Sequence, residues 1–221
     1  MADATPRLAV LASGRGSNLQ AILDAIDDGR LHAQVAGVFG DKPRAFALER
    51  ARAAGIPARA LRPGDFAGRD EFDAALFAEV ASVRPDLIVC AGYMRLLGAA
   101  ALAPWAGRII NIHPSLLPDF KGLDTHARAL AAGVPEHGAS VHFVTADLDG
   151  GPVIAQARVP VLDGDDADAL AARVLDTEHP LLVATLQLLC AARIVLRDEV
   201  VELDGRPLAA PLQLASNRLP A

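Results

Sequence analysis

Short apolar runs alternate with amphipathic stretches through the first half of this 221-residue chain. The apolar runs have the length of buried strands, and the stretches between them carry apolar residues at helical spacing. Parallel strands need crossover connections, so this alternation favours an α/β fold with a mostly parallel, twisted sheet and helices on both faces. The expected strands cover residues 7–12, 34–39, 86–90 and 108–112, and the expected helices cover residues 18–27, 44–54 and 70–83.

The second half of the chain follows a less regular pattern. Two strands are expected at residues 139–144 and 152–159, separated by an Asp-Gly-Gly turn, and a long helix is expected over residues 167–192. A hairpin or edge strand is expected from residue 193 to 202, with a turn at Asp204-Gly205. Because no repeat or linker divides the chain, we expect a single domain over residues 1–221.

The composition of the chain argues against some classes of binding partner. A formal net charge of -6 argues against nucleic-acid and anionic-membrane partners, and no apolar run reaches the roughly 18 residues of a membrane span. The amino-terminal residues lack the features of a signal peptide, so we expect a cytoplasmic protein. Cys90 and Cys190 have no metal-binding spacing; we expect both in the core and no metal cofactor.

The loop after the first expected strand contains Gly14 and Gly16. Backbone amides and the dipole at the start of a helix can bind phosphate, and Ser17 or Asn18 could cap that helix. Leu19 stands where a dinucleotide fingerprint needs its third glycine, and no Gly-Lys-Ser/Thr follows for a nucleoside triphosphate. From this loop alone, a phosphate site and an ordinary glycine-containing turn both stay open.

Polar residues end the strand expected at residues 108–112. Asn111 and His113 lie two positions apart, so they share one face of an extended chain while Ile112 points into the core. Burial of an unpaired amide or imidazole costs roughly 1 to 3 kcal/mol, which indicates that this pair has partners or a function. Pro114 directs the chain away from the sheet at its carboxyl edge, where α/β proteins place their chemistry.

A carboxylate completes the candidate constellation. Asp149 precedes Gly150-Gly151-Pro152, a turn able to bring it close to another loop. Beside His113 it would raise the imidazole pKa and favour imidazolium near neutral pH, while the Asn111 amide suits an oxyanion. No serine or cysteine lies in a nucleophile elbow, so the pattern fits an acyl transfer in which a substrate carries the acceptor. The alternative is a hydrogen-bonded core histidine and a turn aspartate.

Four segments in order resemble the motifs of one enzyme family. They are Ser13-Gly-Arg-Gly-Ser-Asn18, Ala91-Gly-Tyr-Met-Arg-Leu-Leu97, Asn111-Ile-His-Pro-Ser-Leu-Leu-Pro118, and His137-Gly-Ala-Ser-Val-His142 continuing to Asp149-Gly-Gly-Pro152. From about residue 7 to 205 the chain resembles the phosphoribosylglycinamide formyltransferases, folate-dependent enzymes of purine synthesis. The resemblance implies a Rossmann-like formyltransferase fold. It also implies formyl transfer from 10-formyltetrahydrofolate to the amine of glycinamide ribonucleotide, giving formylglycinamide ribonucleotide and tetrahydrofolate.

The resemblance implies roles for individual residues. Asn111, His113 and Asp149 would form the catalytic triad. Gly16, Ser17 and Asn18 would hold the ribonucleotide phosphate, and Glu178 would take the ribose hydroxyls, although a solvated helix glutamate is the alternative. The residues implied for the folate are Arg69, Met94, Arg95, Leu96, Leu97, Asn111, Ala146 and Asp149.

The resemblance implies separate contacts for the pterin and for the glutamate tail of the folate. The pterin would lie against Met94 to Leu97, bonded mainly by backbone, with the loop from Ala146 to Asp149 closing over it. Arg69 would pair with the glutamate tail of the folate. The alternatives are ordinary core for the first segment and a solvated arginine for Arg69.

The resemblance also implies an organisation of the chain. The ribonucleotide side would lie in about residues 1–105 and the folate and catalytic loops in about residues 106–205, in a monomer or weak homodimer. Asp124 departs from the histidine that bacterial relatives often carry, and we expect it to cap the helix that begins there.

Three rival functions share some of these features. Formyltetrahydrofolate deformylase has the same triad but uses water as the acceptor and usually carries an additional amino-terminal domain, for which Arg7 at the first strand leaves no room. Methionyl-tRNA formyltransferase also shares the triad but needs a basic carboxyl-terminal domain for RNA, which an acidic chain of this length does not fit. A nucleotide-binding module without activity would leave Asn111, His113 and Asp149 unexplained.

Overall fold

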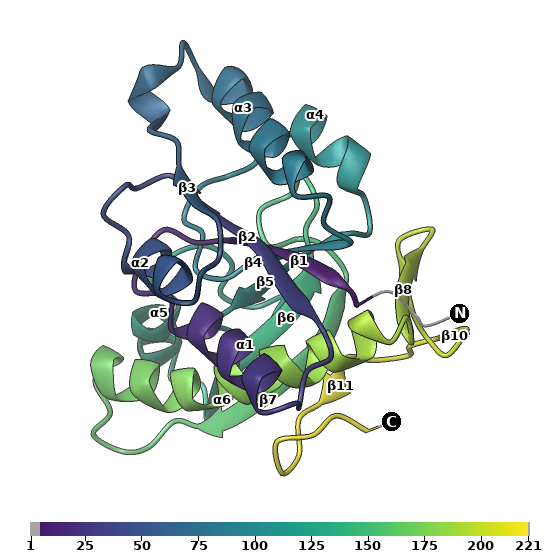
Figure 1. Ribbon diagram of the computed structural model, residues 1–221. Helices are drawn as coiled ribbons and strands as arrows, with labels where there is room; N and C mark the ends of the chain where they lie inside the picture. Colours follow the sequence, from purple (N-terminus) through teal and green to yellow (C-terminus); the bar gives the residue numbers. More distant parts are fainter. Residues whose placement is uncertain (1–4, 221) are drawn as a thin grey trace. The chain divides into compact units, whose positions relative to one another are not determined.

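The computed structural model describes residues 5–220 of the chain (Figure 1). The chain divides into two compact units, the first ending at Ile110 and the second beginning at Asn111. The division falls inside strand β5 (Ile109–His113), so the polar residues at the end of this strand begin the second unit.

The first unit is built on parallel strands. Strand β1 (Arg7–Leu11) pairs in parallel with β2 (Gln34–Gly40) and with β4 (Leu87–Cys90). Strand β3 (Ala58–Ala60) pairs in parallel with β2. The last four residues of β1 are fully buried, as expected of a central parallel strand.

Helices and short turns connect these strands. They are α1 (Ser17–Asp27), α2 (Phe46–Ala53), the 3-10 turn η1 (Pro63–Asp65), α3 (Arg69–Ser82), the single turn α4 (Ala99–Leu102) and the 3-10 turn η2 (Ala103–Trp105). Helix α3 buries Phe72, Leu76 and Val80, four residues apart, which places them on one face. This helical period is the reason the segment was recognisable in the sequence.

The second unit combines an antiparallel strand pair with a long helix. Strands β6 (Glu136–Phe143) and β7 (Val153–Pro160) are antiparallel, and α6 (Ala167–Cys190) packs against both (Figure 1). Asp166 caps α6, because its side chain accepts a hydrogen bond from the Ala169 amide. The remaining elements are α5 (Thr125–Ala132), β8 (Ile194–Arg197), β9 (Val200–Leu203), β10 (Arg206–Pro207) and β11 (Leu212–Gln213).

The expected α/β class is confirmed. Pairings among β1, β2, β3 and β4 are parallel, and β11 runs parallel to β7. The expected terminal hairpin is also present as β8 and β9, which continue into β10. The helix expected to begin at Asp124 is present as α5. The short strands β3 and β11 were not anticipated, because three and two residues carry too little periodicity.

The structure also bears on the burial of the two cysteines and on membrane-spanning helices. Cys90 is buried, as expected, but Cys190 is only partly buried because it is the last residue of α6, so its assignment to the core was wrong. Among residues 5–220, no helix is both long and apolar enough to cross a membrane.

Candidate active site

The first loop forms a tight start to α1. Gly16 precedes the helix with φ 72°, and a Cβ there would lie 2.7 Å from the Ala47 Cα, so this position requires glycine. Gly16 occupies the N-cap position of α1 and has no side chain, and Ser17 and Asn18 lie inside the helix, so neither takes the expected capping position. The first amides of a helix have no partner within it, and without a side-chain cap they can face an anion.

The loop before α1 is tied to the segment implied for the folate. The Ser13 amide donates to the Gly92 carbonyl at 3.0 Å, and the Met94 amide donates to Ser13 Oγ at 3.0 Å. Met94 and Leu96 are 61% and 55% exposed, so the alternative of ordinary core for this segment is wrong. Exposed apolar side chains held on a fixed backbone are suited to contact a planar ligand.

Helix α3 supports the same segment from its buried side. Asp73 Oδ2 accepts a hydrogen bond from the Gly98 amide at 2.7 Å, and the Arg95 guanidinium lies 5.1 Å from the centroid of the Phe72 ring. Burial raises the pKa of the Asp73 carboxyl. Arg69, the first residue of α3, is exposed, with Nε 3.9 Å from Asp70 Oδ1. Its guanidinium is therefore accessible to an acidic ligand.

The end of β5 presents the two polar residues as its pattern predicts. His113 is 6% exposed, Asn111 is partly buried, and Ile112 between them is in the core. Asp149, which has φ 45° at the turn after β6, places Oδ2 3.4 Å from His113 Nδ1. The structure thus brings Asn111, His113 and Asp149 into one cluster within the second unit.

His142 joins this cluster, although sequence reasoning did not assign it a role. Its Nδ1 lies 2.9 Å from the Phe143 carbonyl, which only accepts, so Nδ1 carries the hydrogen and Nε2 accepts from Asn111 Nδ2 at 3.1 Å. The same Nε2 lies 3.6 Å from Asp149 Oδ1. The signal that could have found it is a histidine within a strand whose neighbours are buried, because a buried imidazole needs a polar partner.

The electrostatics of the cluster differ in part from the expectation. Burial lowers the pKa of His113 below its ordinary value, and this outweighs the opposing effects of the Asp149 carboxylate and of the Phe120 carbonyl. Asp149 does favour imidazolium, as expected, but the net direction is downward. For Asp149, burial opposes ionisation, yet its polar neighbours, among them the Gly122 amide and His113, hold its pKa below the ordinary range.

The other sequence candidates have varied environments. Glu178 is 9% exposed on α6, so the solvated alternative is wrong. Ala146 is exposed in the loop that precedes Asp149. Asp124 stands at the N-cap position of α5 with φ 56°, but its side chain makes no capping hydrogen bond, so the expected capping role is wrong.

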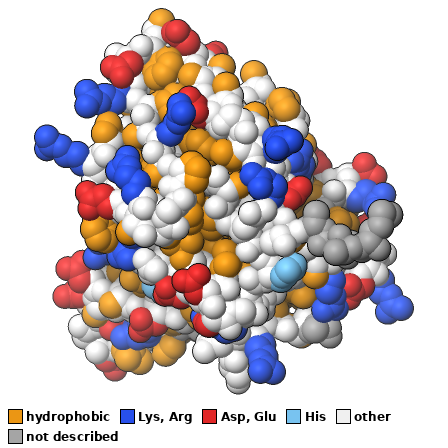
Figure 2. Space-filling model, in the orientation of Figure 1, with side chains coloured by type: hydrophobic (Ala, Val, Ile, Leu, Met, Phe, Trp, Pro, Cys, Tyr) orange, Lys and Arg blue, Asp and Glu red, His pale blue; other side chains and the backbone are white. Residues whose placement is uncertain are grey.

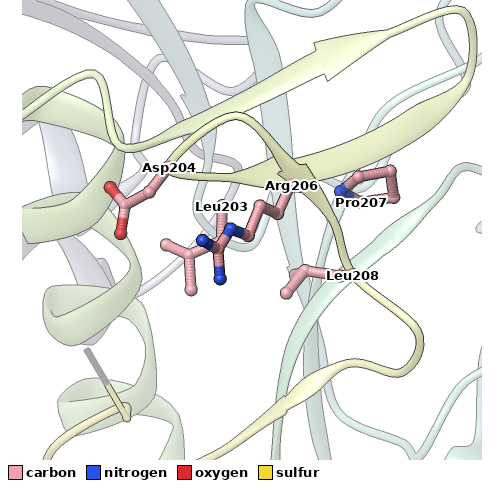
Figure 3. Close-up of a pocket in the computed structure, with 5 residues that line it drawn as sticks. All are labelled: Leu203, Asp204, Arg206, Pro207 and Leu208. Carbon is pink, nitrogen blue, oxygen red and sulfur yellow. The ribbon is translucent and has the colours of Figure 1, made fainter.

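Away from this cluster, residues 5–220 present surfaces of mixed charge and a surface pocket. On the face drawn in Figure 2, cationic and anionic side chains are interspersed. A surface pocket at the turn between β9 and β10 is lined by Leu203, Asp204, Arg206, Pro207 and Leu208 (Figure 3). The Asp204 carboxylate in this pocket is paired with Arg193. Within residues 5–220, no group of three or more histidine, cysteine, aspartate or glutamate side chains is arranged to hold a metal ion.

Comparison with known proteins identifies the family of the chain. Residues 6–186 match the model of the formyl transferase family. The chain is 47% identical over 201 residues to the phosphoribosylglycinamide formyltransferase of Escherichia coli (strain K12), covering 91% of this chain and 95% of that protein. A solved phosphoribosylglycinamide formyltransferase from Coxiella burnetii is 44% identical, with a TM-score of 0.90 over 93% of this chain and 97% of that one.

A related enzyme class is more distant. A solved formyltetrahydrofolate deformylase from Pseudomonas syringae pv. tomato is 26% identical, with a TM-score of 0.84, and the match covers 91% of this chain and 66% of that one. The match to the family model over most of the chain and the 47% identity to the Escherichia coli protein establish that this chain belongs to the formyl transferase family.

Proposed function

We propose that this chain is a phosphoribosylglycinamide formyltransferase, which moves the formyl group of 10-formyltetrahydrofolate to the amine of glycinamide ribonucleotide in purine biosynthesis. The observation that carries the proposal is the buried cluster at the end of β5, where His113 Nδ1 lies 3.4 Å from Asp149 Oδ2 and His142 orients the Asn111 amide. The 47% identity to the Escherichia coli enzyme supports the choice of substrates.

The cluster supplies what a tetrahedral intermediate needs. The substrate amine forms a bond to the formyl carbon, and the formyl oxygen becomes an oxyanion. One hydrogen of Asn111 Nδ2 is engaged by His142, which leaves the second for that oxygen. A negative charge beside the ring raises the pKa of His113, so the intermediate itself favours the imidazolium that stabilises it.

Collapse of the intermediate releases tetrahydrofolate. The bond between the formyl carbon and the folate nitrogen breaks, and a proton from the attacking amine passes to that nitrogen. Asp149 remains ionised through this step, because its pKa is held low by polar neighbours that include the Gly122 amide and His113. Its carboxylate therefore stabilises the charged form of His113 without acting as the proton donor.

Each substrate has a proposed set of contacts. The ribonucleotide phosphate binds at the uncapped start of α1, at Gly16, Ser17 and Asn18, and Glu178 binds the ribose hydroxyls. The folate contacts Asn111 and Asp149 at its formyl end and is otherwise held by Arg69, Met94, Arg95, Leu96, Leu97 and Ala146. The exposure of Met94 and Leu96, and of the Arg69 guanidinium, supports the second set.

The proposal extends to the state of the protein. We propose one formyltransferase domain, acting as a monomer or weak homodimer in the cytoplasm on small molecules rather than on nucleic acid or membranes. The family match over residues 6–186 crosses the division between Ile110 and Asn111 and supports a single functional domain.

A deformylase is the second candidate function. The same cluster could direct water instead of an amine at the formyl carbon, and the likeness to the Pseudomonas syringae protein supports considering it. The lower identity, 26% against 47%, favours the transferase.

The test is turnover of 10-formyltetrahydrofolate with and without glycinamide ribonucleotide. We expect turnover only with the ribonucleotide, loss of turnover in His113→Ala, and normal turnover in the control His32→Ala, which changes an exposed histidine. Release of formate without the ribonucleotide would assign a deformylase. Turnover that survives in His113→Ala would remove the proposed cluster from the reaction.

A further inference from the structure

A loop from Pro114 to Phe120 leaves the sheet after His113, and its last residue contacts the His113 ring. At its far end the Phe120 carbonyl accepts a hydrogen bond from His113 Nε2 at 3.1 Å. A carbonyl only accepts, so Nε2 carries a hydrogen and the other ring nitrogen, Nδ1, faces Asp149. The position of the Phe120 carbonyl therefore decides how the imidazole is turned.

Two buried polar side chains hold the middle of this loop. Ser140 on β6 and Gln156 on β7 are directly opposed in the antiparallel pair and are 0% and 4% exposed. The Leu117 amide donates to Ser140 Oγ at 3.0 Å, and the Leu117 carbonyl accepts from Gln156 Nε2 at 2.9 Å. Both backbone polar groups of Leu117 are thus bound by the side-chain pair.

The pair uses the full hydrogen-bonding capacity of its donor groups. Gln156 Nε2 directs one hydrogen to Leu117 and the other to Ser140 Oγ at 3.0 Å. Ser140 Oγ donates its only hydrogen to the Ser115 carbonyl at 2.7 Å and accepts two bonds. A hydroxyl has one hydrogen and two lone pairs, so this network is complete. Removing one member would leave buried polar groups unpaired.

Further bonds connect the network to the end of the loop. Ser115 Oγ donates to the Asp119 carbonyl at 2.6 Å, and the Asp119 amide donates to the Leu116 carbonyl at 3.0 Å. Asp119 is joined directly to Phe120, so the bonds form a continuous path from the Ser140–Gln156 pair to the carbonyl that binds His113.

We propose that Ser140 and Gln156 are positioning residues for His113, acting through the loop from Pro114 to Phe120. This inference rests on the proposed function. The sheet itself does not require these side chains, because an apolar pair would fill the same positions without a polar network to satisfy. The polar pair is explained by the backbone groups of the loop that it holds.

The pair also affects the charge state of the histidine. The charged and titratable groups that act on His113 are Asp149, His142 and Arg128, and His113 in turn acts on His126 and His137. Asp149 and the Phe120 carbonyl favour the charged ring, whereas burial, and to a smaller extent His142 and Arg128, oppose it. Displacement of the carbonyl therefore lowers the pKa of His113 further. An activity that needs the His113 imidazolium is lost as pH rises through the pKa of His113. In a variant in which that pKa is lower, the activity is therefore lost at a lower pH.

The test compares Gln156→Met, which keeps the volume but removes the amide, with Ser140→Ala and the control Ile154→Ala. Ile154 is fully buried on the same strand as Gln156, so its truncation weakens the core without removing any bond of the network. We expect both network variants to reduce kcat by on the order of tenfold to a hundredfold, as small misplacements of a catalytic group do. The KM for each substrate stays within about twofold, since no proposed binding residue changes. The basic limb of the pH profile moves to lower pH.

A second readout does not depend on activity. In the ligand-free protein, NMR of the ring nitrogens should show a slowly exchanging hydrogen on His113 Nε2 in wild type and Ile154→Ala, and a rapidly exchanging one in the network variants. If the network variants lose thermal stability as the control does but keep the wild-type kcat, pH profile and Nε2 signal, the pair is structural only. If wild type shows the Nε2 signal but transfers no formyl group, the proposed function fails while the positioning inference stands.

Discussion

The Asn111 amide has two hydrogens, and His142 engages one of them at 3.1 Å. Because His142 Nδ1 donates to the Phe143 carbonyl, its Nε2 is left as an acceptor and the orientation of the amide follows. At the residue scale, the oxyanion donor is thus set by a histidine that does not itself need to touch the formyl group.

This arrangement predicts coupling between Asn111 and His142. Asn111→Ala should lower kcat by about a hundredfold or more, which is typical of the loss of one oxyanion donor. His142→Phe should cost less, and the double variant should be no worse than Asn111→Ala, because both changes remove the same oriented donor. Steady-state kinetics of the three variants test this. Additive losses would mean that His142 acts independently of Asn111.

At the element scale, the start of α1 depends on one backbone conformation. Gly16→Ala would place a Cβ 2.7 Å from the Ala47 Cα at φ 72°, so we expect a lower Tm and a higher KM for the ribonucleotide. Gly14→Ala is the matched control, because nothing lies within 4 Å of its added Cβ and its φ is not positive. Thermal melts and ribonucleotide titrations of both variants decide the matter. Equal behaviour of the two would show that α1 tolerates a side chain at this point.

At the scale of the whole molecule, buried histidines make folding sensitive to acid. Burial lowers the pKa of His137 to about 4, with a smaller effect of His126, and lowers the pKa of His113 and of His126 in the same direction. The unfolded chain takes up these protons first, so stability is fully present above about pH 6.5 and is lost as pH falls toward about 4. Asp165, whose pKa is lowered to about 2 mainly by Arg173, adds a further loss below about pH 4.

Thermal melts between pH 8 and pH 4 check this expectation. Wild type should lose Tm steadily below about pH 6.5, and His137→Gln should show a shallower loss because one of the titrating groups is absent. The exposed His32, changed to Gln, should leave the slope as it is in wild type. A Tm that does not change with pH across this range would contradict the assignment of buried, neutral histidines.

Much of this molecule follows from local pattern in its sequence. The strand that ends at His113 and the helix that buries Phe72, Leu76 and Val80 were predictable, because two-residue and four-residue periods depend only on near neighbours. The same period placed Asn111 and His113 on one face. Short elements such as β3 were missed because three residues do not establish a period.

How distant segments meet depends on the packing of the folded chain. The 3.4 Å approach of Asp149 to His113, the contact of His142 with Asn111, and the closing of the loop by Phe120 depend on the path of the chain between them. The net pKa of His113 was also beyond the sequence, because burial, which outweighs the carboxylate, is a property of the packed core. Local sequence pattern was enough to indicate which residues could act and on which face of a strand they lie. Packing decided their distances, their partners and their charge, because these depend on segments that are remote in the chain.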